Sequence, residues 1–266
     1  MKKNPDPRLY DVNFFRTYYP KSGPIADEIK VREERAVEFL VPLKGERVLD
    51  VGCGDGSLVM RMAERGADCV GIDYSKDAIG LAEERKAKSK QNINARVEFK
   101  VMDATRLEFK RNEFDRVVSV DTIEHIYPEP LKQVLGEMDR VCRSPGVIVM
   151  RTAPNPFFEV PFQQLGKFIL KKKSLETDKY HVNLLNWFSL KVMVDMIRGE
   201  KKVLLRNDGR NHFSAKLIGM DNIPKWVYGV ARNFDGLLDS KAGLFMAEKT
   251  PLGIVLARDL WVQIER

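Results

Sequence analysis

Two aspartates and a cluster of three glycines have residue types and a spacing that suit the binding of a nucleoside-like ligand. Asp50 stands just before Gly52, Gly54 and Gly56, and Asp73 lies 19 residues after Gly54. Glycines have no Cβ, so they allow sharp turns and let a ligand touch the main chain. An acid at about the distance of Asp73 typically binds the two hydroxyls of a ribose. These residues predict a ribose-containing ligand.

The elements expected around this group are a strand, a turn and a helix. Arg47–Val51 is a short apolar run with β-branched residues, typical of a buried parallel strand, and a helical pattern starts at Ser57. The next apolar run, Cys69–Asp73, predicts a second strand. A Gly-x-Gly turn after a strand also occurs in dinucleotide-binding folds. A pyrophosphate there would be repelled by Asp50, whereas a cationic ligand would be attracted.

The run Asp50-Val-Gly-Cys-Gly-Asp-Gly56 resembles the acid-x-Gly-x-Gly-x-Gly loop of class I S-adenosylmethionine-dependent methyltransferases. The ammonium and the sulfonium of that cofactor both favour a nearby carboxylate. The resemblance implies a cofactor site that includes Asp50, Gly52, Cys53, Gly54, Gly56, Asp73 and Tyr74. The alternative is a glycine-rich turn without a ligand.

The ends of the third and fourth expected strands add further candidates. The resemblance implies that Asp103 meets the adenine amine, with Met102 and Ala104 against the ring; a solvated loop is the alternative for Asp103. In the family, the loop after the fourth strand lies under the methyl donor, which implies a contact from Asp121. The Glu124-His125 pair recurs in a subgroup that includes quinone-biosynthesis O-methyltransferases, and the resemblance covers roughly residues 45 to 156.

Three residues are candidates for catalysis: Glu124, His125 and His181. Methyl transfer is an in-line displacement, and alignment can contribute up to roughly 7–11 kcal/mol. Deprotonation of an oxygen or nitrogen nucleophile is typically worth roughly 10²–10⁴-fold, which makes His125 and His181 candidate bases. Either histidine could instead be structural. No Asn-Pro-Pro-aromatic run follows the fourth strand, which disfavours methylation of a base amino group.

A divalent metal is an open alternative for the same loop. Asp121, Glu124 and His125 would share a face if the loop began a helical turn, and His181 follows 56 residues after His125. Some quinone O-methyltransferases and small-RNA 2′-O-methyltransferases look similar, with Glu in place of Asp121. Manganese, iron, cobalt or zinc would suit such ligands better than magnesium.

The alternation of strands and helices from residue 47 onward predicts a parallel sheet with right-handed crossovers. The expected fold is α/β, a Rossmann-like, mostly parallel sheet with helices on both faces and a lid inserted after the fifth strand. The expected strands are Arg47–Val51, Cys69–Asp73, Val97–Met102, Asp115–Val120, Val147–Arg151, Val203–Arg206 and Gly253–Ala257. The expected helices include Ala26–Val41, Ser75–Lys90, Pro128–Arg143 ending at Pro145-Gly146, Ser189–Arg198 with Ser189 as its cap, and one around Trp226–Leu238. The second apolar run after residue 241 is the alternative for the last strand.

We interpret residues 1–266 as one domain: cap helices over 1–45, a cofactor-binding core over 46–153, a lid over 154–187 and a C-terminal part over 188–266. The aromatic group Tyr10, Phe14, Phe15, Tyr18 and Tyr19 either caps the ligand pocket or packs on the core. In the lid, Phe158, Phe162, Leu165 and Ile169 fall on one helical face before Lys171–Lys173. Such a segment, 157–173, suits an anionic membrane surface or a greasy substrate, and an ordinary core helix is the alternative.

Composition sets limits on partners and compartment. The chain has 45 basic and 38 acidic residues, a net charge of +7, and 44% hydrophobic residues. This charge fits solubility better than nucleic-acid binding. The three cysteines are widely spaced and suggest free thiols, and no signal peptide or membrane-length apolar run is visible, so we expect a cytoplasmic protein, peripheral at a membrane if the lid binds one.

The expected function is methyl transfer from S-adenosylmethionine to a small, hydrophobic acceptor, with O-methylation favoured over N-methylation. A methyltransferase for RNA or protein is the first alternative, suggested by the basic charge balance. A catalytically silent methyltransferase-like binding subunit is the second, and a nicotinamide oxidoreductase, against which Asp50 argues, is the third.

Overall fold

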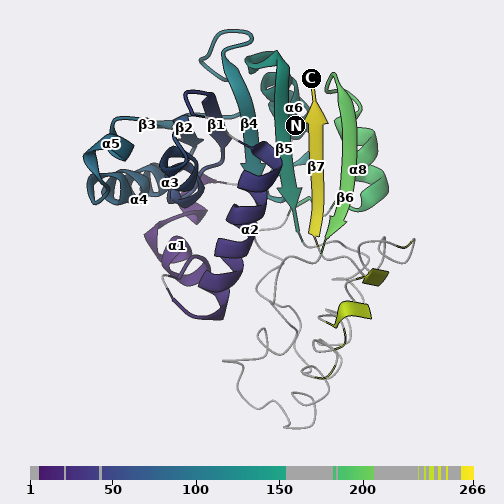
Figure 1. Ribbon diagram of the computed structural model, residues 1–266, viewed down its shortest axis with the longest axis horizontal. Coiled ribbons are helices and arrows are strands. Elements are labelled where there is room, and N and C mark those ends of the chain that lie inside the picture. Colours follow the sequence, from purple (N-terminus) through teal and green to yellow (C-terminus); the bar gives the residue numbers. More distant parts are fainter. Residues whose placement is uncertain are drawn as a thin grey trace.

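The computed structural model describes residues 6–20, 22–41, 44–153, 182–183, 185–206 and 259–266, with isolated positions between 233 and 250. Its centre is a seven-stranded sheet with the order β3-β2-β1-β4-β5-β7-β6 (Figure 1). The strands are β1 Arg47–Val51, β2 Asp68–Asp73, β3 Val97–Val101, β4 Phe114–Val120, β5 Cys142–Thr152, β6 Glu200–Arg206 and β7 Asp259–Glu265. All neighbours from β3 to β5 pair in parallel, and β7 runs antiparallel between β5 and β6. The expected mostly parallel α/β sheet is confirmed.

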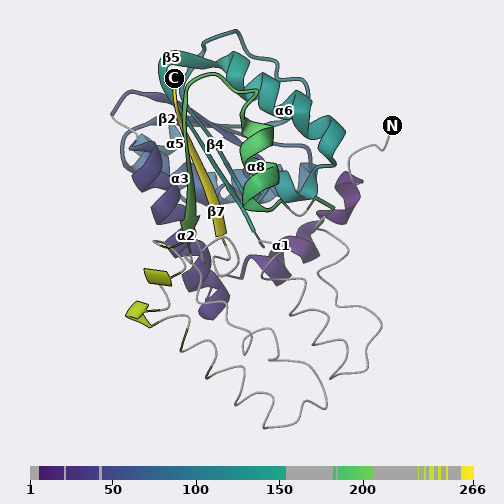
Figure 2. The ribbon, with the colours of Figure 1, turned by 90° about the vertical axis from the view of Figure 1, so that its right-hand side faces the viewer.

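Helices cover both faces of the sheet (Figures 1 and 2). They are α1 Val12–Tyr18, α2 Pro24–Leu40, α3 Ser57–Glu64, α4 Lys76–Ala87, α5 Gln91–Asn94, α6 Pro128–Val141 and α8 Trp187–Val194, with short 3-10 turns at η1 Pro7–Leu9 and η2 Ile123–His125. One apolar cluster joins α2, α3 and α4 to the sheet, and another joins α6 and α8 to its opposite face.

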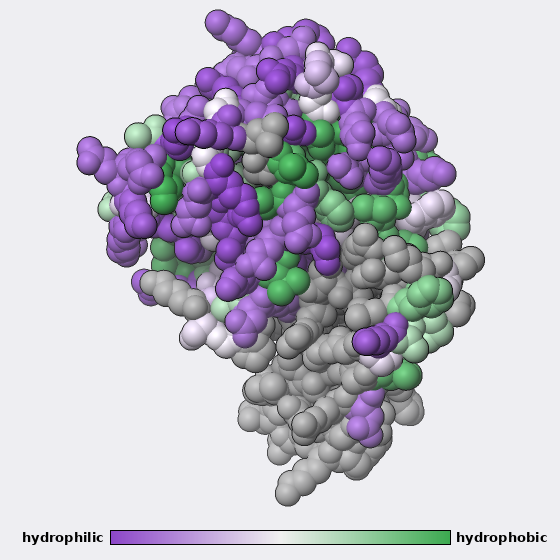
Figure 3. Space-filling model, viewed as in Figure 1, coloured by the Kyte–Doolittle hydropathy of each residue, from purple (hydrophilic) through white to green (hydrophobic). Residues whose placement is uncertain are grey.

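Successive side chains of each strand point to opposite faces of the sheet, so each strand contributes residues to both apolar clusters. Val48 and Val118 point toward the layer of α2, α3 and α4, whereas Leu49 and Val117 point toward α6 and α8. All four side chains are fully buried. Strands covered on both faces read as continuous apolar runs, which is why β1 and β4 were recognisable in the sequence. The outer face of the first helical layer carries mostly hydrophilic residues (Figure 3).

Two caps near the carboxyl ends of the strands fix the N-terminal segment. The Asp11 side chain accepts a hydrogen bond of 2.8 Å from Phe14 N and so caps α1. The predicted cap of α4 is confirmed, because Ser75 Oγ accepts from Ala78 N at 3.2 Å. The Ser75 hydroxyl also donates to the carbonyl of Tyr10 at 2.7 Å, which ties the residues before α1 to the end of β2.

Several element boundaries differ from the sequence-based expectation. The last strand is Asp259–Glu265, the second of the two apolar runs that the sequence left open, and residues 253–257, the other run, lie outside the described residues. The helix expected through Lys90 ends at Ala87, and α5 follows it. Pro145-Gly146 does not end α6 but lies within β5, where the pairing with β4 shifts register between Phe114 and Arg116.

Ser189 is not the cap of α8. Asn186 caps this helix and exchanges hydrogen bonds with Ser189 in a reciprocal capping box, and the helix ends at Val194. Residues 154–181 and most of the expected helix around 226–238 lie outside the described residues, so the lid and the division of the chain stay predictions. Among the described residues, the model has no helix that is both long enough and apolar enough to span a membrane.

Candidate functional site

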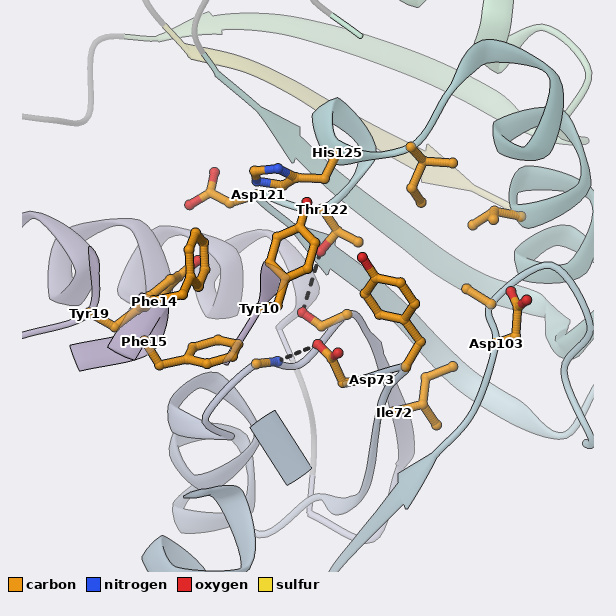
Figure 4. A pocket seen from close by; sticks show the side chains of 16 residues that line it. Tyr10, Phe14, Phe15, Tyr19, Ile72, Asp73, Asp103, Asp121, Thr122 and His125 are labelled. Carbon is orange, nitrogen blue, oxygen red and sulfur yellow. Dashed lines mark hydrogen bonds between the residues drawn. The ribbon is translucent and has the colours of Figure 1, made fainter. Parts of the chain in front are cut away.

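A cavity opens beyond the carboxyl ends of β1, β2, β3 and β4, where open α/β sheets bind their ligands (Figure 4). Its empty volume, including the opening to solvent, is about 750 Å³. Gly52, Asp73, Asp103 and Asp121, each predicted from a different strand end, all line it.

The three glycines after β1 have different structural tasks. A Cβ on Gly52 would collide with the Thr122 side chain, and one on Gly56 would collide with Phe99. A Cβ on Gly54 would approach the ring of Phe15 at 3.2 Å, and both Thr122 and Phe15 line the cavity. All three have positive φ, so the turn itself requires glycine. Gly52 and Gly54 line the cavity, whereas Gly56 serves packing.

Asp73 joins the two loops that a ribose would contact. Its Oδ2 accepts from Gly54 N at 3.1 Å, and its Oδ1 accepts from Ser75 N at 2.8 Å. Burial raises the pKa of Asp73 to about 6. Each carboxylate oxygen has a further lone pair, so Asp73 can still accept from two hydroxyls. Tyr74, the next residue, also lines the cavity, as expected.

The residues after β3 line the side of the cavity away from Tyr19 and Asp121 (Figure 4). Asp103 and Ala104 line it, and Asp103 Oδ1 accepts from Thr105 N at 2.9 Å and from Thr105 Oγ1 at 2.8 Å. The second oxygen of Asp103 can therefore accept from an exocyclic amine. Met102 is partly buried and packs against the core beside Ala104, outside the cavity wall.

A smaller recess of about 430 Å³ meets the cavity at the glycine loop. Asp50, Cys53, Glu33 and Arg32 line it. Burial, and then the carboxylates of Glu33 and Asp73, hold the pKa of Asp50 well above its ordinary value. A ligand ammonium beside Asp50 would favour the ionised carboxylate. Arg32 Nε is buried and has no hydrogen-bond partner within the described part of the chain.

Asp121 lies at the start of the loop after β4, in the left-handed conformation with φ 55°. Its Oδ2 pairs with Arg32 Nη1 at 2.8 Å, and its Oδ1 accepts from Arg151 Nη1. The helical turn that would align Asp121 with Glu124 is not present, because η2 begins only at Ile123. Two guanidinium groups thus hold the carboxylate that was considered as an alternative metal ligand.

Glu124 and His125 point to different places. Glu124 is 2% exposed and lies behind the cavity wall, where it accepts from Thr152 Oγ1 at 3.2 Å. His125 lines the cavity. Among the described residues no group of three or more His, Cys, Asp or Glu is placed to hold a metal ion, and His181 lies outside them. Of the two catalytic candidates that the structure describes, Glu124 and His125, only His125 lines the cavity.

The N-terminal aromatic group forms the cover of the cavity. Tyr10, Phe14, Phe15 and Tyr19 all line it, with Tyr10 and Phe15 each 6% exposed (Figure 4). These rings pack on one another and on Tyr74, so the group both covers the pocket and packs on the core. Sequence reasoning had left these two roles open.

The comparisons with known proteins agree with this geometry. Residues 42–191, more than half of the chain, match a family model described as a methyltransferase domain. The chain belongs to this family. The expected class I S-adenosylmethionine-dependent methyltransferase is thereby confirmed, and the aspartates and glycines described above lie within the matched residues.

Similar proteins include two curated O-methyltransferases. The methyltransferase is 34% identical over 125 residues to the magnesium-protoporphyrin O-methyltransferase of Rhodobacter capsulatus, which covers 47% of this chain and 53% of that protein. It is 27% identical over 204 residues to the ubiquinone biosynthesis O-methyltransferase of Pelagibacter ubique (strain HTCC1062), covering 76% and 78%. The chain therefore spans only about half of the length of the first of these relatives.

A solved structure extends the similarity to the fold. A SAM dependent methyltransferase from Archaeoglobus fulgidus superposes with a TM-score of 0.59 at 18% identity, covering 96% of this chain and 98% of that one. At this identity the likeness concerns the fold alone.

The residues of the site fit S-adenosylmethionine. Asp73 suits the ribose, Asp103 suits the adenine amine, and buried Asp50 suits the ammonium. Sequence reasoning missed Arg32, whose unpartnered Nε suits the carboxylate of the methionine part. A single arginine on an amphipathic helix is usually solvated, so no local pattern distinguished it from its neighbours on α2.

Proposed function

We propose that the methyltransferase binds S-adenosylmethionine across the cavity and the recess and methylates an oxygen of a small, hydrophobic acceptor. The observation that carries this proposal is the aromatic cover, in which Tyr10, Phe14 and Phe15 face the glycine loop and the loop of His125. These rings offer an apolar surface next to one imidazole. The two curated relatives above are named as O-methyltransferases, which favours oxygen over nitrogen.

The residues of this chain have three tasks in the proposed reaction. The cofactor supplies an activated methyl group on a positively charged sulfur. Asp50, Asp73 and Asp103 hold its ends in place, which aligns donor and acceptor. The aromatic cover excludes water, and His125 accepts the proton from the acceptor hydroxyl as the oxygen is methylated.

Glu124 supports His125 rather than touching the acceptor. Its side chain is held by Thr152, and its backbone carbonyl accepts from Val182 N and Asn183 N, both at 3.0 Å. Residues 182–183, within the last part of the predicted lid over 154–187, are thereby attached to the η2 turn. This attachment fixes the backbone from which His125 projects into the cavity.

A membrane surface is the proposed location of the acceptor. The support is the sequence of 157–173, with four apolar side chains at helical spacing followed by three lysines. Liposome flotation tests this part of the proposal. We expect recovery with anionic vesicles that weakens as salt is raised, because attraction to anionic lipid is screened. Equal recovery with neutral and anionic vesicles, or none with either, would contradict it.

The acceptor can be found by mass spectrometry. The protein is incubated with S-adenosylmethionine and fractions of a metabolite extract, and products that gain one methyl group are sought. We expect such a product in an apolar fraction, with fragmentation that places the methyl on oxygen, and none with Asp73→Ala. Methylation of added RNA or protein instead would support the alternative acceptor class, and tight cofactor binding without any product would support a silent binding subunit.

A further inference from the structure

The cavity and the recess meet at a junction of four wall residues. Tyr19, Gly52, Gly54 and Asp121 line both spaces. In Figure 4, Tyr19 and Asp121 lie on the side of the cavity away from Asp103. The residues suited to adenosine and those suited to the amino acid therefore lie on opposite sides of this junction.

The covalent order of S-adenosylmethionine places its sulfur at the junction. In the molecule the sulfur stands between the ribose and the amino-acid carbons. If Asp73 holds the ribose in the cavity and Asp50 and Arg32 hold the amino acid in the recess, the sulfur must pass the four shared residues. This step rests on the placement of the cofactor under the proposed function.

Asp121 is the one residue of the junction that can hold a negative charge. Gly52 and Gly54 have no side chains. Burial raises the pKa of Tyr19 to about 12, so its hydroxyl is neutral at physiological pH. The Asp121 carboxylate is 11% exposed and so is only weakly screened by water.

When a ligand carboxylate binds Arg32, the charged groups around Asp121 favour one additional positive charge. Arg151 is 1% exposed and pairs with both Asp259 and Asp121. The carboxylate of Asp259 alone is enough to match the single positive charge of Arg151. Arg32 is the second partner of Asp121, and its buried Nε has no partner among the residues that the structure describes. A ligand carboxylate on Arg32 would offset that guanidinium, and Asp121 would then lack a matching positive charge.

We propose that Asp121 is the counter-charge of the donor sulfonium and makes the site prefer the charged donor over the neutral product. The donor supplies both a carboxylate for Arg32 and a sulfonium for Asp121. The product, S-adenosylhomocysteine, keeps the carboxylate and the ammonium but has lost the charge on sulfur. Asp121 thereby favours exchange of product for fresh donor.

Calorimetry with two unreactive ligands tests this proposal. S-adenosylhomocysteine is neutral at sulfur, whereas sinefungin carries an ammonium on the carbon that replaces sulfur. Asp121→Asn keeps an oxygen that accepts from the arginines but removes the charge. We expect it to weaken sinefungin binding roughly tenfold, as for loss of one interaction with a charged group, and S-adenosylhomocysteine by less than twofold. Asp103→Asn is the matched control and should affect both ligands equally.

A second variant, Arg32→Gln, should shift the ratio of the two affinities in the opposite direction. This test does not require Asp121→Asn to fold. Arg32→Gln, on the partly exposed end of the pair, should weaken both ligands through the lost carboxylate contact. Because Asp121 then loses a competing cation, the ratio of affinities should move several-fold toward sinefungin. A ratio unchanged by either variant would overturn the role of Asp121. Failure of the unmodified protein to bind either ligand would instead overturn the cofactor placement.

Discussion

Tyr10 and His125 lie edge to face in the wall of the cavity, with ring centroids 5.6 Å apart and planes at 85°. Tyr10 also lies 5.7 Å from Tyr74, and its carbonyl is held by Ser75 at 2.7 Å. One buried ring thus joins the end of β2, where the ribose is expected, to the loop that bears the candidate base. The N-terminal cover and the His125 loop are therefore one packed unit.

Replacement of His125 should separate binding from chemistry. His125→Asn removes the proton acceptor and keeps a polar side chain, so we expect turnover to fall roughly 10²–10⁴-fold. Binding of S-adenosylhomocysteine should change by less than about twofold, since His125 is assigned to the acceptor. Tyr10→Phe, which preserves the ring contact, is the control and should retain most activity. Equal loss of binding and turnover in His125→Asn would show that the histidine is structural.

Replacement of Gly52 should damage the site through Thr122. An added Cβ would collide with the Thr122 side chain and would sit on a backbone with φ 78°, a conformation that costs a side chain roughly 1–2 kcal/mol. We expect Gly52→Ala to lower the free energy of unfolding by at least that amount and to abolish cofactor binding. Gly80→Ala, in the middle of α4 with nothing within 4 Å, should be neutral or stabilising by up to about 1 kcal/mol. Denaturant unfolding of the two variants in parallel provides the comparison.

Replacement of Asp73 should lower the affinity for the cofactor and should also remove the contacts of Asp73 with the two loops beside the ribose site. Asp73→Ala removes the acceptor for two expected hydroxyls as well as for Gly54 N and Ser75 N. The loss of affinity for S-adenosylhomocysteine should be roughly 1–3 kcal/mol, or about 5- to 150-fold. Asp68→Ala, at the other end of β2 and paired on the surface with Arg96, should leave the affinity unchanged. Calorimetry that ranks the two variants equally would remove Asp73 from the cofactor site.

Glu124 should give the stability a characteristic pH dependence. Burial raises its pKa from 4.5 to about 7. The folded state therefore holds the proton more tightly than the unfolded chain does. The contribution of Glu124 to the free energy of unfolding should be complete below about pH 4.5 and should be lost as the pH rises toward 7, by at most about 1.4 kcal/mol per pH unit.

Glu124→Gln isolates this effect, because glutamine cannot ionise and can still accept from Thr152. The contribution of Glu124 should be absent in this variant, so its stability should fall less between pH 5 and 7 than that of the unmodified protein. Asp73, whose pKa is also raised, is present in both proteins and cancels in the comparison. Parallel slopes in urea unfolding at several pH values would show that Glu124 does not titrate in this range.

The strands from β1 to β5 and the placement of Asp50, Asp73 and Asp103 were predictable from local pattern. Each of these acids stands at or just beyond the end of an apolar strand, and parallel strands bring their carboxyl ends to one edge of the sheet. The cofactor loop could be predicted from seven consecutive residues, because its acid and its glycines all lie within them.

The residues that reach the site from a distance were not predictable in the same way. Arg32 arrives through the packing of α2 across the strand ends, which no short pattern encodes. For Asp121, the assumption of a helical turn failed because the residue adopts a left-handed conformation before η2 starts. The last strand was left open because two apolar runs competed, and pairing with both β5 and β6 decides between them.

A crystal structure of the protein with S-adenosylhomocysteine would show the cofactor site itself. We expect the ribose hydroxyls on Asp73, the adenine amine at Asp103, the ammonium at Asp50 and the ligand carboxylate at Arg32, with the sulfur beside Asp121. A ligand bound elsewhere, or reversed so that its adenine lies in the recess beside Asp50, would contradict this placement.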